Sequence, residues 1–398
     1  MSEILHIKNF GPIKDVKLEI KKFNVIIGEN ATGKSTIAKL LSFCRYFTNI
    51  QGGYYDEKTQ ENKNHGLEEI EEKLRKWGLF EYIRKDSFVS YECKDYKYTF
   101  DNRIWESGGF SAIDNKYYDE KVYHLTSSIN PITNEFRNLL DEYYLLENGG
   151  KLSNEFFENF VADVLENPFF IYTERGLQSI FSLGKDFTSN LSDPLFRYFV
   201  DMDKISRSFK GVTAITPLKI EYKNIDGKSE IRKMGENDFT NLHNAASGYK
   251  SLIPIVLVIE YYNKIRKKKK TFIIEEPELN LFPKVQRELM NYLIAETTNK
   301  DNQVLLTTHS PYTLTSLNNL MYAFEIGKKN YEEVNKIIES KCWVSPDNVS
   351  AYMLLPDGTC EAIMDREENL IRAEKIDNIS GFLNEQFDAL LNIELIEK

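Results

Sequence analysis

The sequence predicts an α/β fold in which a mixed or parallel β-sheet forms the core and an inserted, mostly helical lobe interrupts it. Three observations lead to this prediction. Short apolar runs at the start of the chain are typical of strands, and they lead into a glycine-rich loop and a helical run. A long polar stretch rich in Lys and Glu then shows helical periodicity. Beyond it, apolar strand-like runs alternate with helical ones, which is the pattern of a parallel sheet.

The N-terminal elements follow one another closely. Strands are predicted over residues 4–8, 16–20 and 24–27, and a helix is predicted over residues 37–43. Gly11 and Pro12 mark the turn after the first strand. The expected order is therefore three strands, a glycine-rich loop and a helix.

Residues 45–168 are predicted to be an insertion, with helical periodicity at 67–77 and at 134–146. Apolar and polar residues partly alternate over residues 87–100, which predicts a β-ribbon inside this insertion. The insertion contains no motif that we can assign. We therefore expect it to be the part of the chain that carries specificity.

The core is predicted to comprise residues 1–44 and 169–325, and residues 326–398 to form a C-terminal α/β extension. The extension contains a predicted hairpin that turns at Asp357 and Gly358. The elements expected after the insertion are a strand at 171–173, a hairpin at 218–234, an apolar run at 251–262, a strand at 271–274, a helix at 285–295 and a strand at 304–307.

The chain carries 51 Lys and Arg against 61 Asp and Glu, which gives a net charge of −10. This balance argues against a surface that is basic all over, as in many nucleic-acid-binding proteins. One local basic run, residues 264–270, is either a solvated loop or a patch that contacts DNA. The sequence shows no signal-peptide layout and no run of about 18 apolar residues, so we expect a cytoplasmic protein without a membrane-spanning segment.

Residues 28–36, Gly-Glu-Asn-Ala-Thr-Gly-Lys-Ser-Thr, fit the phosphate-loop pattern G-x-x-x-x-G-K-[ST] between a predicted strand and a helical run. Glycines let backbone N–H groups curl around phosphates, Lys34 can reach the β- and γ-phosphates, and Ser35 can ligate Mg²⁺. The predicted nucleotide-binding residues are Asn30, Ala31, Thr32, Gly33, Lys34, Ser35 and Thr36.

The apolar strand predicted at 271–274 ends in two adjacent carboxylates, Glu275 and Glu276. Because side chains alternate along a strand, these two point in different directions. We expect Glu275 to lie near Mg²⁺, through the water shell of the ion, and Glu276 to face the attacking water as a catalytic base.

With both motifs present, the chain resembles the ABC ATPases of the SMC and RecF group, most closely the stand-alone bacterial AAA family that shares its ATPase core with the OLD nucleases. Residues 4–13, Ile-Leu-His-Ile-Lys-Asn-Phe-Gly-Pro-Ile, are similar to the family's first strand and turn. Residues 277–283, Pro-Glu-Leu-Asn-Leu-Phe-Pro, are similar to the segment that lines its dimer seam. The resemblance implies an ABC-type ATPase head that takes ATP with Mg²⁺.

Two further stretches carry the same resemblance. Residues 245–251, Ala-Ala-Ser-Gly-Tyr-Lys-Ser, are similar to the signature motif, which in this family caps the γ-phosphate of ATP bound by the opposite subunit. The trans contacts that this implies fall to Ser247, Gly248 and Lys250. Residues 307–311, Thr-Thr-His-Ser-Pro, resemble the switch-histidine motif, which implies that His309 acts in catalysis beside Glu276. A homodimer or a higher oligomer is therefore expected.

Residues 169–178 resemble the segment between lobes in which a glutamine or its neighbours sense the metal and the γ-phosphate, and this points to Gln178 as a metal contact. An exposed ion pair between Glu174 and Arg175 is the alternative for this segment. In the OLD nucleases a Toprim nuclease domain follows the core and needs an Asp-x-Asp pair. Residues 326–398 contain no Asp-x-Asp, so no nuclease is expected here.

The function that the resemblance implies is an ATP-driven switch. Two protomers close over two ATP molecules, hydrolyse them and act on a separate effector, a nuclease or a toxin, as sensor subunits of bacterial antiphage systems do. The alternative is a RecF- or SMC-like recombination or repair ATPase that clamps DNA. A transporter subunit would carry its signature closer to the phosphate loop, and a P-loop kinase would need neither the Ser247 nor the His309 motif.

Overall fold

The structure is a computed structural model, and it describes residues 3–50, 54–56, 61–63, 74–93, 96–101, 168–177, 193–215, 219–365, 367–372 and 386. A six-stranded sheet in the order β16-β15-β3-β14-β13-β8 forms the centre of this part of the chain. Its strands are β3 (Phe23–Gly28), β8 (Phe169–Ile171), β13 (Thr271–Glu275), β14 (Gln303–Thr308), β15 (Val349–Leu354) and β16 (Cys360–Ala362). All neighbours are parallel except β16, which pairs with β15 in the antiparallel sense.

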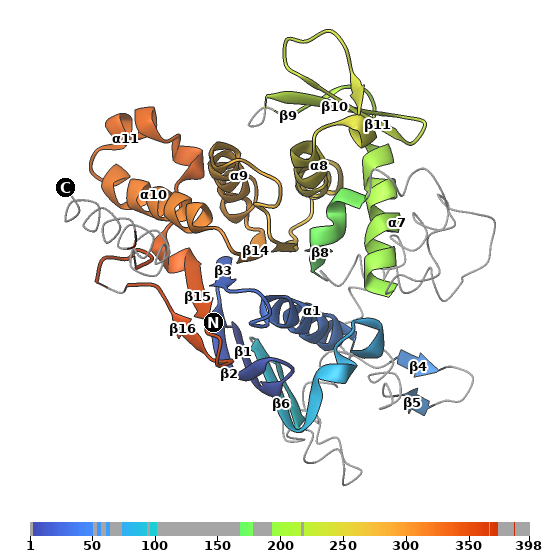
Figure 1. Cartoon of the computed structure of the whole chain (residues 1–398), viewed down its shortest axis with the longest axis vertical. Coiled ribbons are helices and arrows are strands. Elements are labelled where there is room, and N and C mark those ends of the chain that lie inside the picture. The colour runs from blue at the N-terminus through green and yellow to red at the C-terminus, as the bar shows by residue number, and fades with distance from the viewer. Residues whose placement is uncertain are drawn as a thin grey trace, which may run out of the picture.

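Helices cover both faces of this sheet (Figure 1). Helix α1 (Lys34–Ile50) lies on one face, and helices α8 (Ser247–Glu260), α9 (Pro283–Glu296) and α10 (Pro311–Gly327) lie on the other. Helices α7 (Asp193–Ser208) and α11 (Tyr331–Ile337) flank this second layer at its two ends. Among the described residues, no helix combines the length and the apolar character that crossing a membrane requires.

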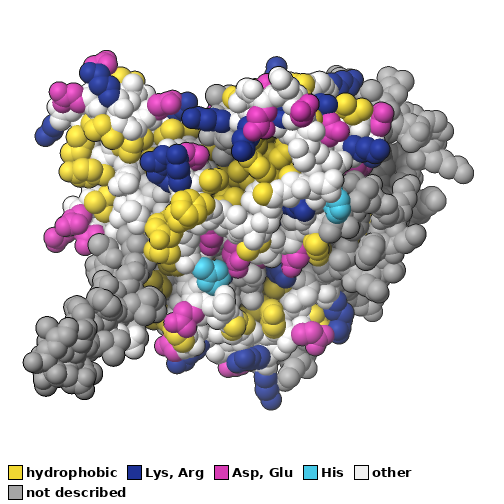
Figure 2. All heavy atoms as spheres, turned by 45° about the horizontal axis from the view of Figure 1, so that its top comes forward, with side chains coloured by type: hydrophobic (Ala, Val, Ile, Leu, Met, Phe, Trp, Pro, Cys, Tyr) yellow, Lys and Arg dark blue, Asp and Glu magenta, His cyan; other side chains and the backbone are white. Residues whose placement is uncertain are grey.

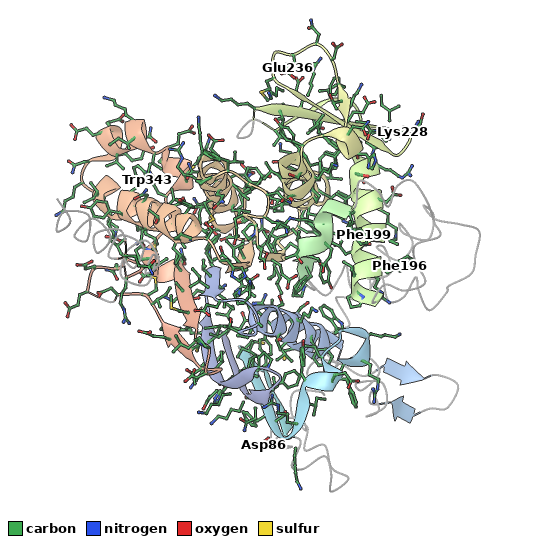
Figure 3. The ribbon with its side chains drawn as sticks, viewed as in Figure 1. Asp86, Phe196, Phe199, Lys228, Glu236 and Trp343 are labelled. Carbon is green, nitrogen blue, oxygen red and sulfur yellow. The ribbon has the colours of Figure 1, made fainter. Side chains whose placement is uncertain are left out.

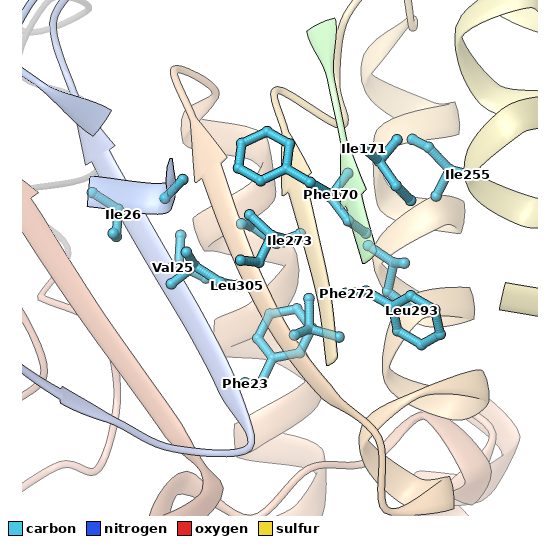
Figure 4. Packing of buried hydrophobic residues seen from close by; sticks show 14 of the residues in the cluster. Phe23, Val25, Ile26, Phe170, Ile171, Ile255, Phe272, Ile273, Leu293 and Leu305 are labelled. Carbon is cyan, nitrogen blue, oxygen red and sulfur yellow. The ribbon is translucent and has the colours of Figure 1, made fainter. Parts of the chain in front are cut away.

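The core lies between these layers because the parallel strands are apolar on both faces. Figure 4 shows Val25 and Ile26 of β3, Phe272 and Ile273 of β13 and Leu305 of β14 packed side by side. Ile255 of α8 and Leu293 of α9 contribute to the same core from the helical layer, and both are fully buried. This packing fixes the strand ends from which the candidate site is built.

A second, antiparallel sheet in the order β2-β1-β6-β7 lies beyond α1 (Figure 1). Its strands are β1 (Glu3–Phe10), β2 (Ile13–Ile20), β6 (Ile83–Cys93) and β7 (Tyr96–Asp101). Arg45 of α1 joins the two sheets, because its Nε donates to Glu3 Oε1 of β1 at 2.7 Å and its Nη1 donates to Thr271 Oγ1 of β13 at 2.8 Å. Both sheets are thereby held against α1, the helix that follows the glycine-rich loop.

A third, small sheet of strands β12-β11-β10-β9 stands above α7 and α8. Its strands are β9 (Thr213–Ile215), β10 (Ile220–Ile225), β11 (Lys228–Lys233) and β12 (Thr240–Asn241), and a separate pair is formed by β4 (Tyr54–Asp56) and β5 (Glu61–Lys63). Figure 3 places Lys228 on β11 and Glu236 in the loop that follows this strand, both away from the ends of the central strands. This small sheet therefore lies next to α8 and is not part of the strand ends that form the candidate site.

The structure confirms the other predicted strands and helices of the core, but the strand predicted at 171–173 is β8 at Phe169–Ile171, because the chain turns into a 3₁₀ helix at Thr173. It also confirms the ribbon of β6 with β7, the hairpin of β10 with β11 and the hairpin of β15 with β16. It differs from the expected domain plan in two pairings. Strand β6, expected inside the insertion, pairs with β1 of the core, and β15, expected in the C-terminal extension, pairs with β3. Residues 134–146 and most of 67–77 lie outside the described part of the chain.

Candidate functional site

The predicted site residues follow the ends of neighbouring parallel strands. Glu275 on β13 lies beside Thr307 on β14, and Thr307 lies beside Ile26 on β3. Because the carboxyl ends of parallel strands meet at one edge of a sheet, the segments that follow them converge there. The loop after Gly28, the carboxylates after Ile274 and the segment that contains His309 are thus brought together.

Two residues with positive φ turn the loop between β3 and α1. Ala31 has φ 64° and Gly33 has φ 103°, a region that glycine adopts without steric cost. The first backbone hydrogen bond of α1 then runs from Ile37 N to Gly33 O at 3.0 Å. A helix N-terminus that follows such a loop presents backbone N–H groups to an anion, so the loop has the geometry of a phosphate site.

Lys34 lies under this loop and is only 6% exposed. Its Nζ donates to Gly28 O at 2.9 Å and to Glu29 O at 2.8 Å. Burial lowers the pKa of Lys34, and the charges of Glu276 and Glu278 oppose that shift. The ammonium group is therefore placed between the phosphate loop and the carboxylates that follow β13.

Glu275 is the buried carboxylate of the site, with 4% exposure. Its Oε1 is buried and has no hydrogen-bond partner among the described residues. The Ser35 hydroxyl is near enough to favour the ionised form of the carboxylate. A buried carboxylate oxygen without a partner is costly, and a hard cation supplies the missing interaction. Ser35 and Glu275 therefore fit Mg²⁺, which would neutralise phosphate charge when it is bound.

Burial raises the pKa of Glu275 above its ordinary value. The Ser35 hydroxyl and the positive charge of Lys39 oppose this rise in pKa. The Glu275 carboxyl group therefore binds its proton more tightly in the folded protein than in the unfolded chain. This tighter binding stabilises the folded protein at low pH, and the stabilisation is lost as the pH rises through the raised pKa. Mg²⁺ binds the carboxylate form, so we expect the Mg²⁺ affinity of the ATP-loaded protein to fall as the pH is lowered through that same pKa.

The substitution Glu275→Gln should stabilise the Mg²⁺-free protein by about 1 kcal/mol, because it removes a buried charge. It should also weaken Mg²⁺ binding by about tenfold or more and remove its pH dependence. Thermal unfolding in EDTA and Mg²⁺ titrations of ATP binding between pH 5 and pH 8 measure both effects. An unchanged Mg²⁺ affinity in Glu275→Gln would contradict the assignment.

Glu276 adopts φ 42°, which is uncommon for a residue with a side chain. Its backbone N–H donates to Thr307 O at 2.9 Å, and its side-chain Oε1 lies 3.3 Å from His309 Nε2. Both side chains are about one-third exposed, at 32% for Glu276 and 31% for His309. The predicted base and the predicted switch histidine thus meet at the carboxyl-end edge of the sheet, and both are partly exposed there.

Glu278 holds His309 in place, a role that the sequence did not reveal. Its Oε1 accepts hydrogen bonds from Thr308 Oγ1 at 2.9 Å and from the backbone N–H of His309 at 2.7 Å. Ser310 then caps α10 by accepting from Tyr312 N. The sequence does show a third carboxylate, Glu278, in the Glu-Glu-Pro-Glu run. Only the fold shows that this carboxylate reaches the end of β14 and contacts the His309 backbone.

The signature-like residues open α8. The helix begins at Ser247, which is exposed, while Gly248 and Lys250 are half-buried in its first turn. A Cβ at Gly248 would lie 3.1 Å from Asn280 O, in the loop between β13 and α9, so this position favours glycine. The predicted contact of Ser247, Gly248 and Lys250 with a partner's nucleotide stays a prediction.

Arg175 corrects the expectation for the segment after β8. An exposed ion pair with Glu174 is wrong, because Arg175 is completely buried and donates to four backbone carbonyl groups. Two of these belong to Glu275 and Glu276. Gln178 lies outside the described residues, so its predicted metal contact stays a prediction.

The basic run at 264–270 is partly engaged within the protein. Lys264 forms an ion pair with Glu260, and Lys269 Nζ lies 3.2 Å from Asp301 Oδ2. Lys270 is 7% exposed, and its amine lies 4.8 Å from the centre of the Tyr262 ring. Figure 2 shows positive and negative side chains interspersed over the face that it presents, with hydrophobic side chains between them.

The family model described as AAA ATPase domain matches residues 1–63 and 44–314. A comparison with curated proteins found no match.

Three solved structures of SMC heads are similar to this chain at low sequence identity. An SMC head bound to the C-winged helix domain of ScpA has 13% identity and a TM-score of 0.42, with 91% of this chain and 96% of that chain covered. The SMC head domain from Thermotoga maritima has 11% identity and a TM-score of 0.36, with 91% and 98% covered. The Smc head with an extended coiled coil bound to the C-terminal domain of ScpA, from Pyrococcus furiosus, has 13% identity and a TM-score of 0.36, with 100% and 99% covered.

Proposed function

Because the chain belongs to the AAA ATPase domain family, we propose that it binds MgATP, hydrolyses it, and does so between two copies of itself. The observation that carries this proposal is the meeting of four groups at one sheet edge. Lys34 lies under the phosphate loop, Glu275 offers a buried oxygen for Mg²⁺, and Glu276 lies 3.3 Å from His309. Together they supply the phosphate, metal and base functions that hydrolysis of ATP requires.

In the proposed reaction, Glu276 accepts a proton from a water molecule while the water oxygen bonds to the γ-phosphorus. The bond from that phosphorus to the β,γ-bridging oxygen breaks, and ADP and phosphate are released. Lys34 offsets negative charge on the phosphates, and His309 orients the Glu276 carboxylate. Because the site is partly exposed, a second surface is needed to exclude bulk water, which favours a shared site.

The second surface proposed here is the start of α8 in another copy. Ser247 is exposed at the N-terminus of a 14-residue helix, where the helix dipole favours an anion. Lys250 in the same turn adds positive charge. Two copies related by a two-fold axis would each provide one phosphate loop and one α8 terminus to each nucleotide.

The mass of the Glu276→Gln protein by light scattering, with and without MgATP, tests this arrangement at several protein concentrations. We expect a dimer or higher oligomer that forms or tightens with MgATP, because the variant binds ATP without consuming it. The matched control is Glu276→Gln combined with Ser247→Arg, which places a bulky cation at the seam and should remove the ATP dependence. A protein that binds ATP and stays monomeric would contradict the shared site.

We further propose that the dimer is a cytoplasmic switch that controls a separate effector, a nuclease or a toxin, in bacterial antiviral defence. The support is the resemblance of the phosphate loop, the signature-like segment and the switch-histidine segment to those of stand-alone bacterial AAA ATPases. The test is whether the product of a neighbouring gene copurifies with the Glu276→Gln protein. We expect this copurification to require MgATP. Equal recovery with and without MgATP would contradict control by the nucleotide.

A DNA recombination or repair ATPase is the second candidate, and the basic run at 264–270 favours it. The engagement of Lys264 and Lys269 by Glu260 and Asp301 leaves less free charge for phosphates. Affinity for DNA that falls steeply with salt, and that depends on Lys267 and Lys268, would favour this function over the effector-coupled switch.

A further inference from the structure

Arg175 occupies an unusual position for an arginine. It lies in the short 3₁₀ helix Thr173–Leu177 that follows β8, and its side chain is completely buried. The guanidinium donates from Nη1 to Tyr172 O at 3.0 Å and from Nε to Ser251 O at 2.8 Å. Burial lowers the pKa of Arg175, opposed by nearby carboxylates, but an arginine keeps its proton in a protein. The buried guanidinium of Arg175 is therefore hydrogen-bonded to backbone carbonyl groups from more than one element.

Two further hydrogen bonds reach the end of β13. Arg175 Nη1 donates to Glu275 O at 2.8 Å, and Nη2 donates to Glu276 O at 2.6 Å. The second bond holds the peptide group of a residue with φ 42°, a conformation that persists only where its surroundings impose it. Because the backbone at Glu276 sets where its carboxylate points, Arg175 orients the predicted base without touching the reacting atoms.

The same guanidinium is bonded to α8. Ser251, its acceptor there, lies one turn after the signature-like residue Ser247. The hydroxyl of Ser251 accepts a second hydrogen bond, from Asn280 Nδ2 at 3.0 Å. Asn280 belongs to the loop after Glu276 and has φ 61°. Ser251 is thus linked to the segment that carries the base directly through Asn280 and indirectly through Arg175.

We propose that Arg175 is a positioning residue that couples the placement of α8 to the direction of the Glu276 carboxylate. This inference rests on the proposed function, in which Ser247 meets the partner's ATP and Glu276 activates water. A shift of α8 on nucleotide contact moves Ser251 O, and the planar guanidinium transmits the shift to the carbonyl groups of Glu275 and Glu276.

The test compares Arg175→Lys with the matched control Arg207→Lys on the exposed side of α7. Lysine keeps the charge but lacks the planar fork, so it cannot serve acceptors on three elements at once. We expect the affinity of Arg175→Lys for a fluorescent ATP analogue with Mg²⁺ to stay within about threefold of the wild type while kcat falls about 30-fold. Arg207→Lys should change neither.

A second variant, Asn280→Gly, keeps the left-handed backbone available and removes only the amide that bonds to Ser251. We expect kcat to fall by about fivefold, and the double variant with Arg175→Lys to lose less than the product of the two single effects, because both act through Ser251. Thermal unfolding of every variant accompanies the kinetics, so that a folding defect is recognised.

Three results would overturn the coupling. They are a kcat of Arg175→Lys within twofold of the wild type, a parallel loss of affinity, kcat and melting temperature, and single effects that multiply fully in the double variant. Phosphate release by the wild type that does not depend on Glu276 contradicts the proposed function itself. That failure is separate, because it appears before any Arg175 variant is compared.

Discussion

Replacing Glu276 with glutamine is expected to lower kcat for ATP hydrolysis by about 100-fold or more, because a general base contributes rate factors of about that size. Glutamine has nearly the same shape and keeps an oxygen that can face His309 Nε2, but its amide cannot take the proton of the attacking water. The affinity for MgATP should stay close to that of the wild type, since Lys34 and the phosphate loop are unchanged. Phosphate release at saturating ATP, together with equilibrium ATP binding, measures the two effects separately.

A matched control is Glu325→Gln, in the last turn of α10, where the partly exposed Glu325 pairs with Lys328. This variant loses one carboxylate far along the chain from the strand ends and should retain wild-type turnover. Full turnover in Glu276→Gln would instead remove Glu276 from the role of base. A loss of ATP binding in parallel with turnover would mean that the carboxylate acts in binding.

The strand–loop–helix start of the core could be predicted from the sequence because its signals are local. The spacing of Gly28, Gly33 and Lys34 between an apolar strand and a helical run specifies a phosphate loop, and the match to the AAA ATPase domain confirms the family. The roles of the carboxylates Glu275 and Glu276 could also be predicted from the sequence, because two charged residues at the end of a buried strand are unusual. Their meeting with His309 follows from the parallel register.

Strand pairing between distant segments could not be predicted in the same way. Nothing in the local pattern of β6 indicates β1 as its neighbour, and nothing in that of β15 indicates β3. A pattern of apolar residues specifies a strand and its buried faces, but its partners depend on the whole chain. The expected boundaries at residues 45 and 325 therefore separated strands that the fold joins.

Arg175 shows the same limit at the level of one side chain. In sequence it is a charged residue beside Glu174, and such pairs are usually exposed. Its burial depends on carbonyl groups contributed by Ser251, Glu275 and Glu276, which come from two other elements. A buried arginine is stable only when its donors are satisfied, and that can be judged only after the fold is known.

The substitution Lys34→Ala is expected to weaken ATP binding by about 100-fold or more, because charge-assisted hydrogen bonds to two phosphate groups are lost together. The fold should be affected far less. Lys34 is a buried ammonium whose pKa is lowered by that burial, so its removal relieves a desolvation cost while Gly28 O and Glu29 O lose a donor. These two effects on stability oppose each other.

Binding and stability therefore separate in this variant, and the separation distinguishes a ligand contact from a structural one. Calorimetric titration with MgATP should show no heat of binding for Lys34→Ala at concentrations that saturate the wild type, while thermal unfolding without nucleotide changes by a few degrees. Lys329→Ala, an exposed lysine near the end of α10, is the control and should bind normally. If Lys34→Ala bound MgATP as the wild type does, the loop after β3 would be a structural turn, and the assignments of Glu275 and Glu276 that depend on it would fail as well.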